Sequence, residues 1–135
     1  QIISYAVKYA SNYYGPFRDA IGSKSKLKSN KKNYQMDFKN NSEAIREVAL
    51  DIKEGADMII VKPGLPYLDI IKTMKENFKI PIISYQVSGE YSLIQNGIKN
   101  KIISKDAIYE TLMSFKRAGS TAIISYFADR LDQII

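Results

Sequence analysis

The stretch from Asp57 to Gly64 reads Asp-Met-Ile-Ile-Val-Lys-Pro-Gly, and the fold can be worked out from it. Its apolar residues are consecutive rather than alternating, which is typical of a strand buried on both faces. Pro63 and Gly64 form a turn directly after Lys62. A helical pattern then runs from Leu65 to Phe78, with a second proline in its first turn. The segment therefore predicts a strand, a turn and a helix.

The same combination recurs along the chain. Three further apolar runs are rich in isoleucine and valine, at residues 2–7, 80–87 and 121–127. Further helical patterns extend over residues 42–55, 104–119 and 129–135. This alternation predicts an α/β protein with a parallel sheet. A doubly wound sheet and part of a (β/α)8 TIM barrel both fit it.

The length of the chain bears on the barrel alternative. A complete barrel needs about 250 residues, whereas this chain has 135 and begins at Gln1 within an apolar stretch. We expect one domain, residues 1–135, which in the barrel alternative would be roughly the C-terminal half of a longer protein.

The composition limits the class of protein and the side chains that could take part in catalysis. The chain is 45% hydrophobic and 25% charged, which predicts a packed core, and no apolar run is long enough to span a bilayer. We therefore expect a soluble protein with no membrane partner. The sequence contains neither cysteine nor histidine, so acid–base chemistry must use lysine, tyrosine or carboxylates.

Polar side chains stand where the predicted strands end, which is where active sites lie in parallel α/β folds. Lys8 and Lys62 end the first two strands, and Ser125-Tyr126 ends the fourth. A lysine at a buried strand end must be paired or lose its charge. Because desolvation and a neighbouring cation both lower a lysine pKa, Lys62 is predicted to be an amine nucleophile that attacks a ketone.

The segment after Lys8 offers further groups. Gly15-Pro16 predicts a turn, and Arg18 can bind a carboxylate through two hydrogen bonds. Residues 22–33 are too polar for the core and predict a long loop, of the kind that often forms an active-site lid.

These residues together resemble one family, delta-aminolevulinic acid dehydratase, also called porphobilinogen synthase. The resemblance covers essentially the whole chain, in order. It is carried by residues 4–11, 14–20, 34–35, 55–63, 85–91 and 116–119. It implies a (β/α)8 barrel whose C-terminal portion is this chain. It also implies the condensation of two 5-aminolevulinate molecules to porphobilinogen, a lyase reaction of tetrapyrrole (haem) biosynthesis.

The resemblance also implies roles for individual residues. Lys62 and Lys8 match the lysines that bind the first and second substrates as Schiff bases. Groups near the first substrate are matched by Ser88, Tyr126 and Tyr85, of which Ser88 and Tyr126 hold its carboxylate. Arg18 and Gln35 match groups that hold the carboxylate of the second substrate. Tyr14 and Phe17 match the aromatic wall. Lys31 stands where the family usually has a second carboxylate-binding arginine.

A metal and an assembly are implied in the same way. Glu47 matches a glutamate that holds an allosteric magnesium at a subunit interface in one branch of the family. Ligands of any active-site metal would lie upstream of Gln1, so the active-site metal stays unknown. The resemblance further implies a homo-octamer of the full-length protein. The sequence does not report the compartment, for which the cytoplasm and a plastid-type organelle are both open.

Two alternatives remain. Another lysine Schiff-base barrel, such as a class I aldolase, would need only one essential lysine. A basic module could instead bind nucleic acid through the lysines between residues 24 and 32, since the net charge is +6. Such a run is more often a solvated loop, and we expect no nucleic-acid partner.

Overall fold

Four parallel strands form one sheet in the computed structural model, which describes residues 1–22 and 34–133. They are β1 (Ile3–Lys8), β2 (Met58–Lys62), β3 (Ile82–Tyr85) and β4 (Ala122–Ile124). Their order in space is their order in the chain. A doubly wound sheet reverses its strand order, whereas a barrel keeps it, so this order favours an arc of a (β/α)8 barrel.

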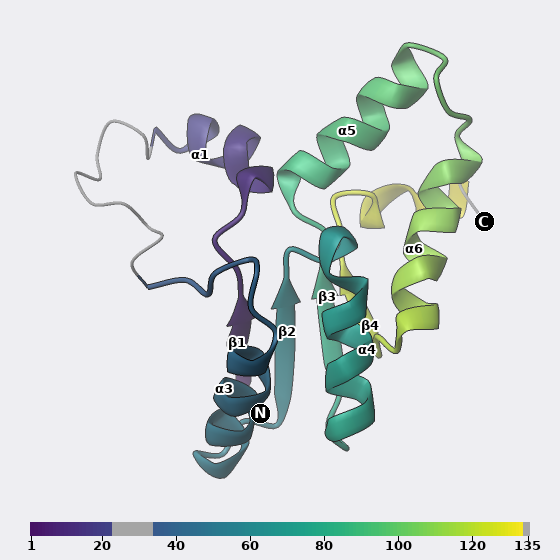
Figure 1. Ribbon diagram of the computed structural model, residues 1–135. Helices are drawn as coiled ribbons and strands as arrows, with labels where there is room; N and C mark the ends of the chain where they lie inside the picture. Colours follow the sequence, from purple (N-terminus) through teal and green to yellow (C-terminus); the bar gives the residue numbers. More distant parts are fainter. Residues whose placement is uncertain (23–33, 134–135) are drawn as a thin grey trace.

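Three helices lie on one face of the sheet (Figure 1). They are α3 (Ser42–Lys53), α4 (Leu68–Asn77) and α6 (Asp106–Ala118), and the short 3-10 helix η3 (Leu65–Tyr67) leads into α4. The core lies between these helices and the strands, where Ile59, Ile71 and Phe115 are fully buried. Burial of apolar surface in this layer is the main force that holds the helices to the sheet.

The other face of the sheet is more open. Ile3 and Tyr5 of β1 are 46% and 49% exposed, and Ile124 of β4 is 38% exposed. In a closed barrel, side chains on this face would fill the interior. None of the helices in the described ranges has the length and apolar character needed to cross a bilayer.

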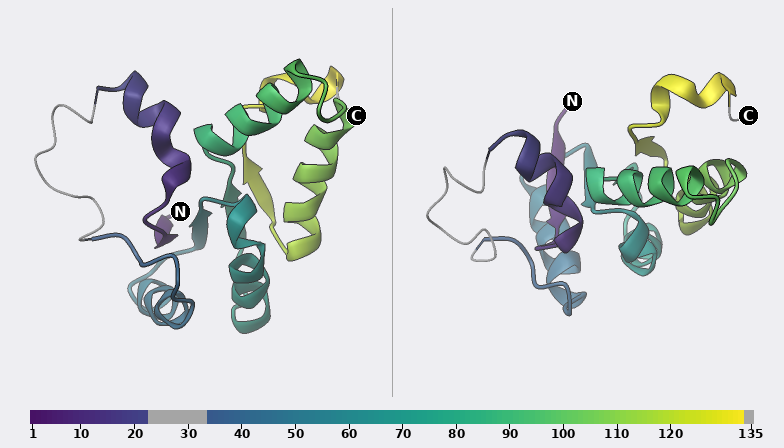
Figure 2. Two further views of the ribbon diagram at one scale, coloured as in Figure 1. Left: turned by 45° about the horizontal axis from the view of Figure 1, so that its top comes forward. Right: turned by 90° about the horizontal axis from the view of Figure 1, so that it is seen from above.

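The carboxyl ends of the strands carry a second group of short elements. These are η1 (Asn12–Tyr14), α1 (Gly15–Ala20), α5 (Ser88–Lys99) and η4 (Ala128–Gln133). Figure 1 shows α1 and α5 beyond the carboxyl ends of the strands, and the right-hand view of Figure 2 looks down on them from above. This end of the sheet is where the candidate site residues gather.

The structure corrects several predicted boundaries. Gly15-Pro16 is the first turn of α1 rather than a separate turn, because proline is well tolerated at the start of a helix. The helix predicted from Ser104 begins at Asp106. Helix α5 is not among the predicted helices, because its polar start and two glycines weaken the helical pattern.

Candidate functional site

Lys8 and Lys62 end neighbouring strands. Their Cα atoms are partners in the β1–β2 ladder, and the Tyr9 backbone N–H donates to the Lys62 carbonyl oxygen at 3.0 Å. The structure thus brings together the two lysines predicted from strand ends that lie more than fifty residues apart in the sequence.

The surroundings of the Lys62 amine are aromatic. Its Nζ lies 3.7 Å from the ring centroid of Tyr85, 5.4 Å from that of Tyr5 and 6.0 Å from that of Tyr14. Ring faces favour the ammonium form. Burial, and to a lesser extent the charge of Lys8, act in the opposite direction and lower the pKa of Lys62 below its ordinary value. The amine is therefore easier to deprotonate than that of an exposed lysine.

One side of Lys62 faces a small pocket, here called the Ser88 pocket, of about 30 Å³. It is lined by Tyr14, Phe17, Lys62, Tyr85, Val87, Ser88 and Tyr126. The Ser88 hydroxyl accepts a hydrogen bond from the Phe17 backbone N–H at 3.1 Å, so its own proton can be donated to a ligand. Burial and the neighbouring Tyr126 raise the pKa of Tyr85, which keeps that phenol protonated.

The other side of Lys62 faces a second pocket, here called the Lys8 pocket, of about 70 Å³. It is lined by Lys8, Tyr14, Phe17, Arg18, Gln35 and Lys62. The Arg18 guanidinium lies 5.0 Å from the centroid of the Tyr14 ring. Gln35 is buried, and its Oε1 has no hydrogen-bond partner among the described residues. Cationic and amide groups in one hollow suit a carboxylate ligand.

Tyr14 separates the two pockets. Its hydroxyl donates to the carbonyl oxygens of Tyr9, at 3.1 Å, and of Lys62, at 3.2 Å. Burial raises its pKa above the ordinary value. With its proton held by two backbone acceptors, Tyr14 acts as a fixed wall rather than as a proton donor. Lys31 and all of the predicted lid except Gly22 lie outside the described residues.

Glu47 lies on α3 and lines neither of the two lysine pockets. Its side chain is 38% exposed, and its Oε1 is 3.3 Å from Nη2 of Arg46. It lines a third pocket together with Glu43, Lys8 and Gln35. Across the described ranges no group of three or more acidic, histidine or cysteine side chains is placed to hold a metal ion. A pocket with two carboxylates, Glu43 and Glu47, suits a cation that keeps most of its water ligands, as Mg²⁺ does.

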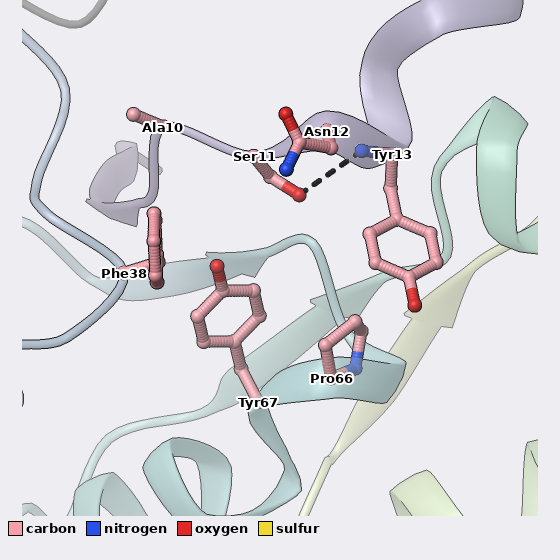
Figure 3. Close-up of a pocket in the computed structure, with 7 residues that line it drawn as sticks. All are labelled: Ala10, Ser11, Asn12, Tyr13, Phe38, Pro66 and Tyr67. Atoms are coloured by element: carbon pink, nitrogen blue, oxygen red, sulfur yellow. Dashed lines mark hydrogen bonds between the residues drawn. The ribbon is translucent and has the colours of Figure 1, made fainter.

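Another pocket, of about 250 Å³, is larger than the two lysine pockets but smaller than the pocket beside Glu47, of about 360 Å³, and its lining is neutral. Figure 3 shows its lining side chains: Ala10, Ser11, Asn12, Tyr13, Phe38, Pro66 and Tyr67. The Ser11 hydroxyl accepts from the Tyr13 backbone N–H at 3.2 Å. Because no amine or carboxylate lines it, this pocket is not suited to carbonyl chemistry, despite its size.

Sequence reasoning missed two residues near Lys62. Tyr5 approaches the amine from β1, and only the alternation of side chains along that strand could have pointed to it. Glu90 is 1% exposed and accepts a hydrogen bond from the backbone N–H of Leu65, which lies just after Lys62 in the chain. Its position three residues into a helix after Val87 is the pattern of a capping carboxylate, which the sequence analysis did not use.

A family model and known relatives that match this chain carry the same name. The family model for delta-aminolevulinic acid dehydratase matches residues 1–134. A relative of that name from Bradyrhizobium diazoefficiens is 54% identical over 131 residues, which are 96% of this chain and 37% of the relative. A chloroplastic one from Oryza sativa is 47% identical over 135 residues, 99% of this chain and 32% of the relative.

A solved structure matches as well. It is a crystal structure of delta-aminolevulinic acid dehydratase from Toxoplasma gondii in complex with the reaction product porphobilinogen. Its TM-score is 0.94 at 47% identity, and the match covers 98% of this chain and 38% of that one. The chain thus spans roughly a third to two fifths of the length of the proteins that it resembles.

Proposed function

Because the chain belongs to the delta-aminolevulinic acid dehydratase family, we propose that the protein containing it condenses two molecules of 5-aminolevulinate to porphobilinogen with loss of water. One observation carries the proposal. The Lys62 amine, whose pKa is lowered, lies between two adjoining pockets that differ in their polar groups.

The chemistry begins at the Lys62 amine. Its neutral form attacks the ketone carbon of the first substrate, water leaves, and a protonated imine forms between Nζ and that carbon. The imine withdraws electrons, so a proton on the adjacent carbon is lost more easily and that carbon can form a new carbon–carbon bond. Lys8 would bind the second substrate as an imine in the same way.

Each pocket offers groups for one substrate. In the Ser88 pocket, the hydroxyls of Ser88 and Tyr126 would hold the first carboxylate, with Tyr85 beside the Lys62 amine. In the Lys8 pocket, Arg18 and Gln35 would hold the second carboxylate, and Lys31 would add charge. Tyr14 and Phe17 line both pockets and would keep water from the two substrates.

Borohydride trapping tests the proposal. The full-length protein is mixed with 5-aminolevulinate, reduced, and its peptides are mapped by mass. We expect a substrate adduct on Lys62 and a second on Lys8. Lys62→Met should abolish the first adduct, whereas Lys72→Met, at an exposed lysine paired with Glu76, should not. No adduct on the wild-type Lys62 would refute the mechanism, and an adduct on Lys62 alone would favour a class I aldolase.

We also propose that Glu47 holds an allosteric magnesium. Members of the family use metals, and a half-exposed carboxylate with Glu43 in the same pocket suits a hydrated Mg²⁺. Such an ion supplies positive charge and ordered water when bound. Glu47 would contribute one oxygen ligand, and other contacts would come from a neighbouring subunit of a homo-octamer. A cytoplasmic or plastid location, the latter as for the rice relative, belongs to the same proposal.

Magnesium titration of the full-length protein tests the role of Glu47. Glu47→Ala should lower both the Mg²⁺ affinity measured by calorimetry and the activation by Mg²⁺, because the direct ligand is gone. The matched control is Glu110→Ala, which removes an exposed glutamate from α6. Unchanged Mg²⁺ binding in Glu47→Ala would contradict this part of the proposal.

A further inference from the structure

Glu90 is a buried carboxylate that the reaction described above does not use. It is the third residue of α5 and is 1% exposed. One oxygen accepts from the backbone N–H of Leu65 and the other from that of Val87, and the Gly64 N–H also contributes. The same side chain therefore binds the start of its own helix and the turn that follows Lys62.

These hydrogen bonds offset the cost of burying the carboxylate. A buried charge without partners is strongly unfavourable. Among the described residues, the groups that donate to Glu90 are the backbone amides of Gly64, Leu65 and Val87. Burial raises the pKa of Glu90 to about 7, while the amides act to lower it. An apolar residue of similar size could fill the space, but it could not bind the amides of two separate segments.

The two residues before Glu90 contact a third segment. A Cβ atom added to Gly89 would lie 2.2 Å from the carbonyl oxygen of Tyr13, so the α5 backbone passes directly against η1. Ser88 accepts from the Phe17 N–H of α1. The first turn of α5 thus joins the segment after β1, the turn after β2 and the end of β3.

The turn after Lys62 is closely packed on its other side. A Cβ atom added to Gly64 would lie 2.6 Å from the Phe115 ring and 3.3 Å from the Tyr85 carbonyl oxygen. Pro63 and Gly64 are both buried. The turn is therefore held between α6 and the carboxylate of Glu90, and it has little room to move while that carboxylate is in place.

We propose that Glu90 is a positioning residue, whose carboxylate ties the turn after Lys62 to the first turn of α5 so that the Lys62 amine and the Ser88 hydroxyl face one pocket. This rests on the proposed function, because it assumes that Lys62 forms an imine with a substrate whose carboxylate lies at Ser88. Glu90 itself lines neither lysine pocket.

Two measurements on the full-length protein test this inference. Hydrogen exchange of the amides of residues 64, 65 and 87 reports whether Glu90 holds the turn. Borohydride trapping with 5-aminolevulinate reports the ratio of the adduct on Lys62 to that on Lys8. In Glu90→Ala we expect faster exchange and a fall of at least about tenfold in the ratio, as expected when hydrogen bonds to a charged group are lost. Glu90→Gln keeps one acceptor oxygen and should restore part of the ratio.

A control separates positioning from general destabilisation. Ser120 is buried, and its hydroxyl is bonded to that of Ser84 rather than to Glu90, so Ser120→Ala removes a buried hydrogen bond while the hydrogen bonds of Glu90 remain. Its ratio should match that of the wild type. Equal losses of both adducts in Glu90→Ala, or unchanged exchange, would overturn the inference. If Glu90→Ala does not fold, the same criteria apply to Glu90→Gln. A wild type without an adduct on Lys62 would refute the proposed function, while the exchange data would still decide whether Glu90 holds the turn.

Discussion

At the scale of single residues, the position of Lys8 beside Lys62 predicts how the reaction of the Lys62 amine depends on pH. Only the neutral amine attacks a carbonyl, so adduct formation rises as pH rises through the pKa of Lys62. Burial and the charge of Lys8 lower that pKa. Lys8→Met removes the smaller of these causes, so the midpoint for trapping at Lys62 should move to higher pH. Burial remains in the variant, and the midpoint should stay below the ordinary lysine value of 10.5.

The control for this prediction is Lys72→Met, which removes a positive charge from the exposed face of α4. Solvent screens a charge at that position, so the midpoint at Lys62 should not change. Trapping at Lys62 is measured across a pH series by peptide mass. A midpoint that stays in place, or moves to lower pH, in Lys8→Met would show that the charge of Lys8 does not act on Lys62.

At the scale of elements, the first turn of α5 gives the clearest prediction. Gly89→Ala would place a Cβ atom against the backbone of Tyr13, which cannot rotate away as a side chain can. We expect a loss of about 1–3 kcal/mol in the free energy of unfolding, the usual range for overpacking. Denaturant unfolding of the full-length protein measures it.

Gly97, in the last turn of the same helix, is the matched control. A Cβ atom there would meet only the end of the Ile103 side chain, which is 39% exposed and free to move. Because alanine also favours a helix over glycine by about 0.5–1 kcal/mol, Gly97→Ala should lie within about 1 kcal/mol of the wild type. Equal stability of the two variants would show that the contact between α5 and η1 is not tight.

The helices and strands also show which parts of the fold could be predicted from the sequence. Consecutive apolar residues and helical spacing predicted β1, β2, α3 and α4 with small errors at their ends. These elements bury a continuous surface, so their periodicity is strong. In α5, residues 88–90 are buried by contacts with η1, α1 and the turn after β2, and no local pattern records such contacts.

Some residues of the candidate site could likewise be predicted from the sequence, and others could not. The rule that sites lie at the carboxyl ends of strands was enough to single out Lys8 and Lys62. The grouping of Ser88 and Tyr126 with Lys62, and of Arg18 and Gln35 with Lys8, came from the family resemblance. In the structure, Ser88 and Tyr126 line one pocket with Lys62. Arg18 and Gln35 line the other with Lys8. Tyr5 could not be found by either route, because its approach to Lys62 depends on the register between β1 and β2.

At the scale of the whole molecule, the four strands form an arc with two outer strands. In the described part of the chain, β1 pairs with β2, with a register shift between Ser4 and Val7, and β4 pairs with β3. The sheet face opposite the helices carries half-exposed apolar side chains on both outer strands, Ile3 and Tyr5 on β1 and Ile124 on β4. Outer strands with exposed apolar side chains are prone to pair with other chains.

We therefore expect residues 1–135, expressed alone, to self-associate with rising concentration, as measured by size-exclusion chromatography with light scattering. Ile3→Lys should reduce this association, because a lysine on an outer strand opposes pairing with another chain. Leu50→Lys is the matched control, since Leu50 is as exposed as Ile3, at 46%, but lies on α3 within the helical layer. It should leave the association largely unchanged. A monodisperse monomer at all concentrations would mean that the arc is stable without further strands, and equal effects of the two substitutions would place the association outside the sheet.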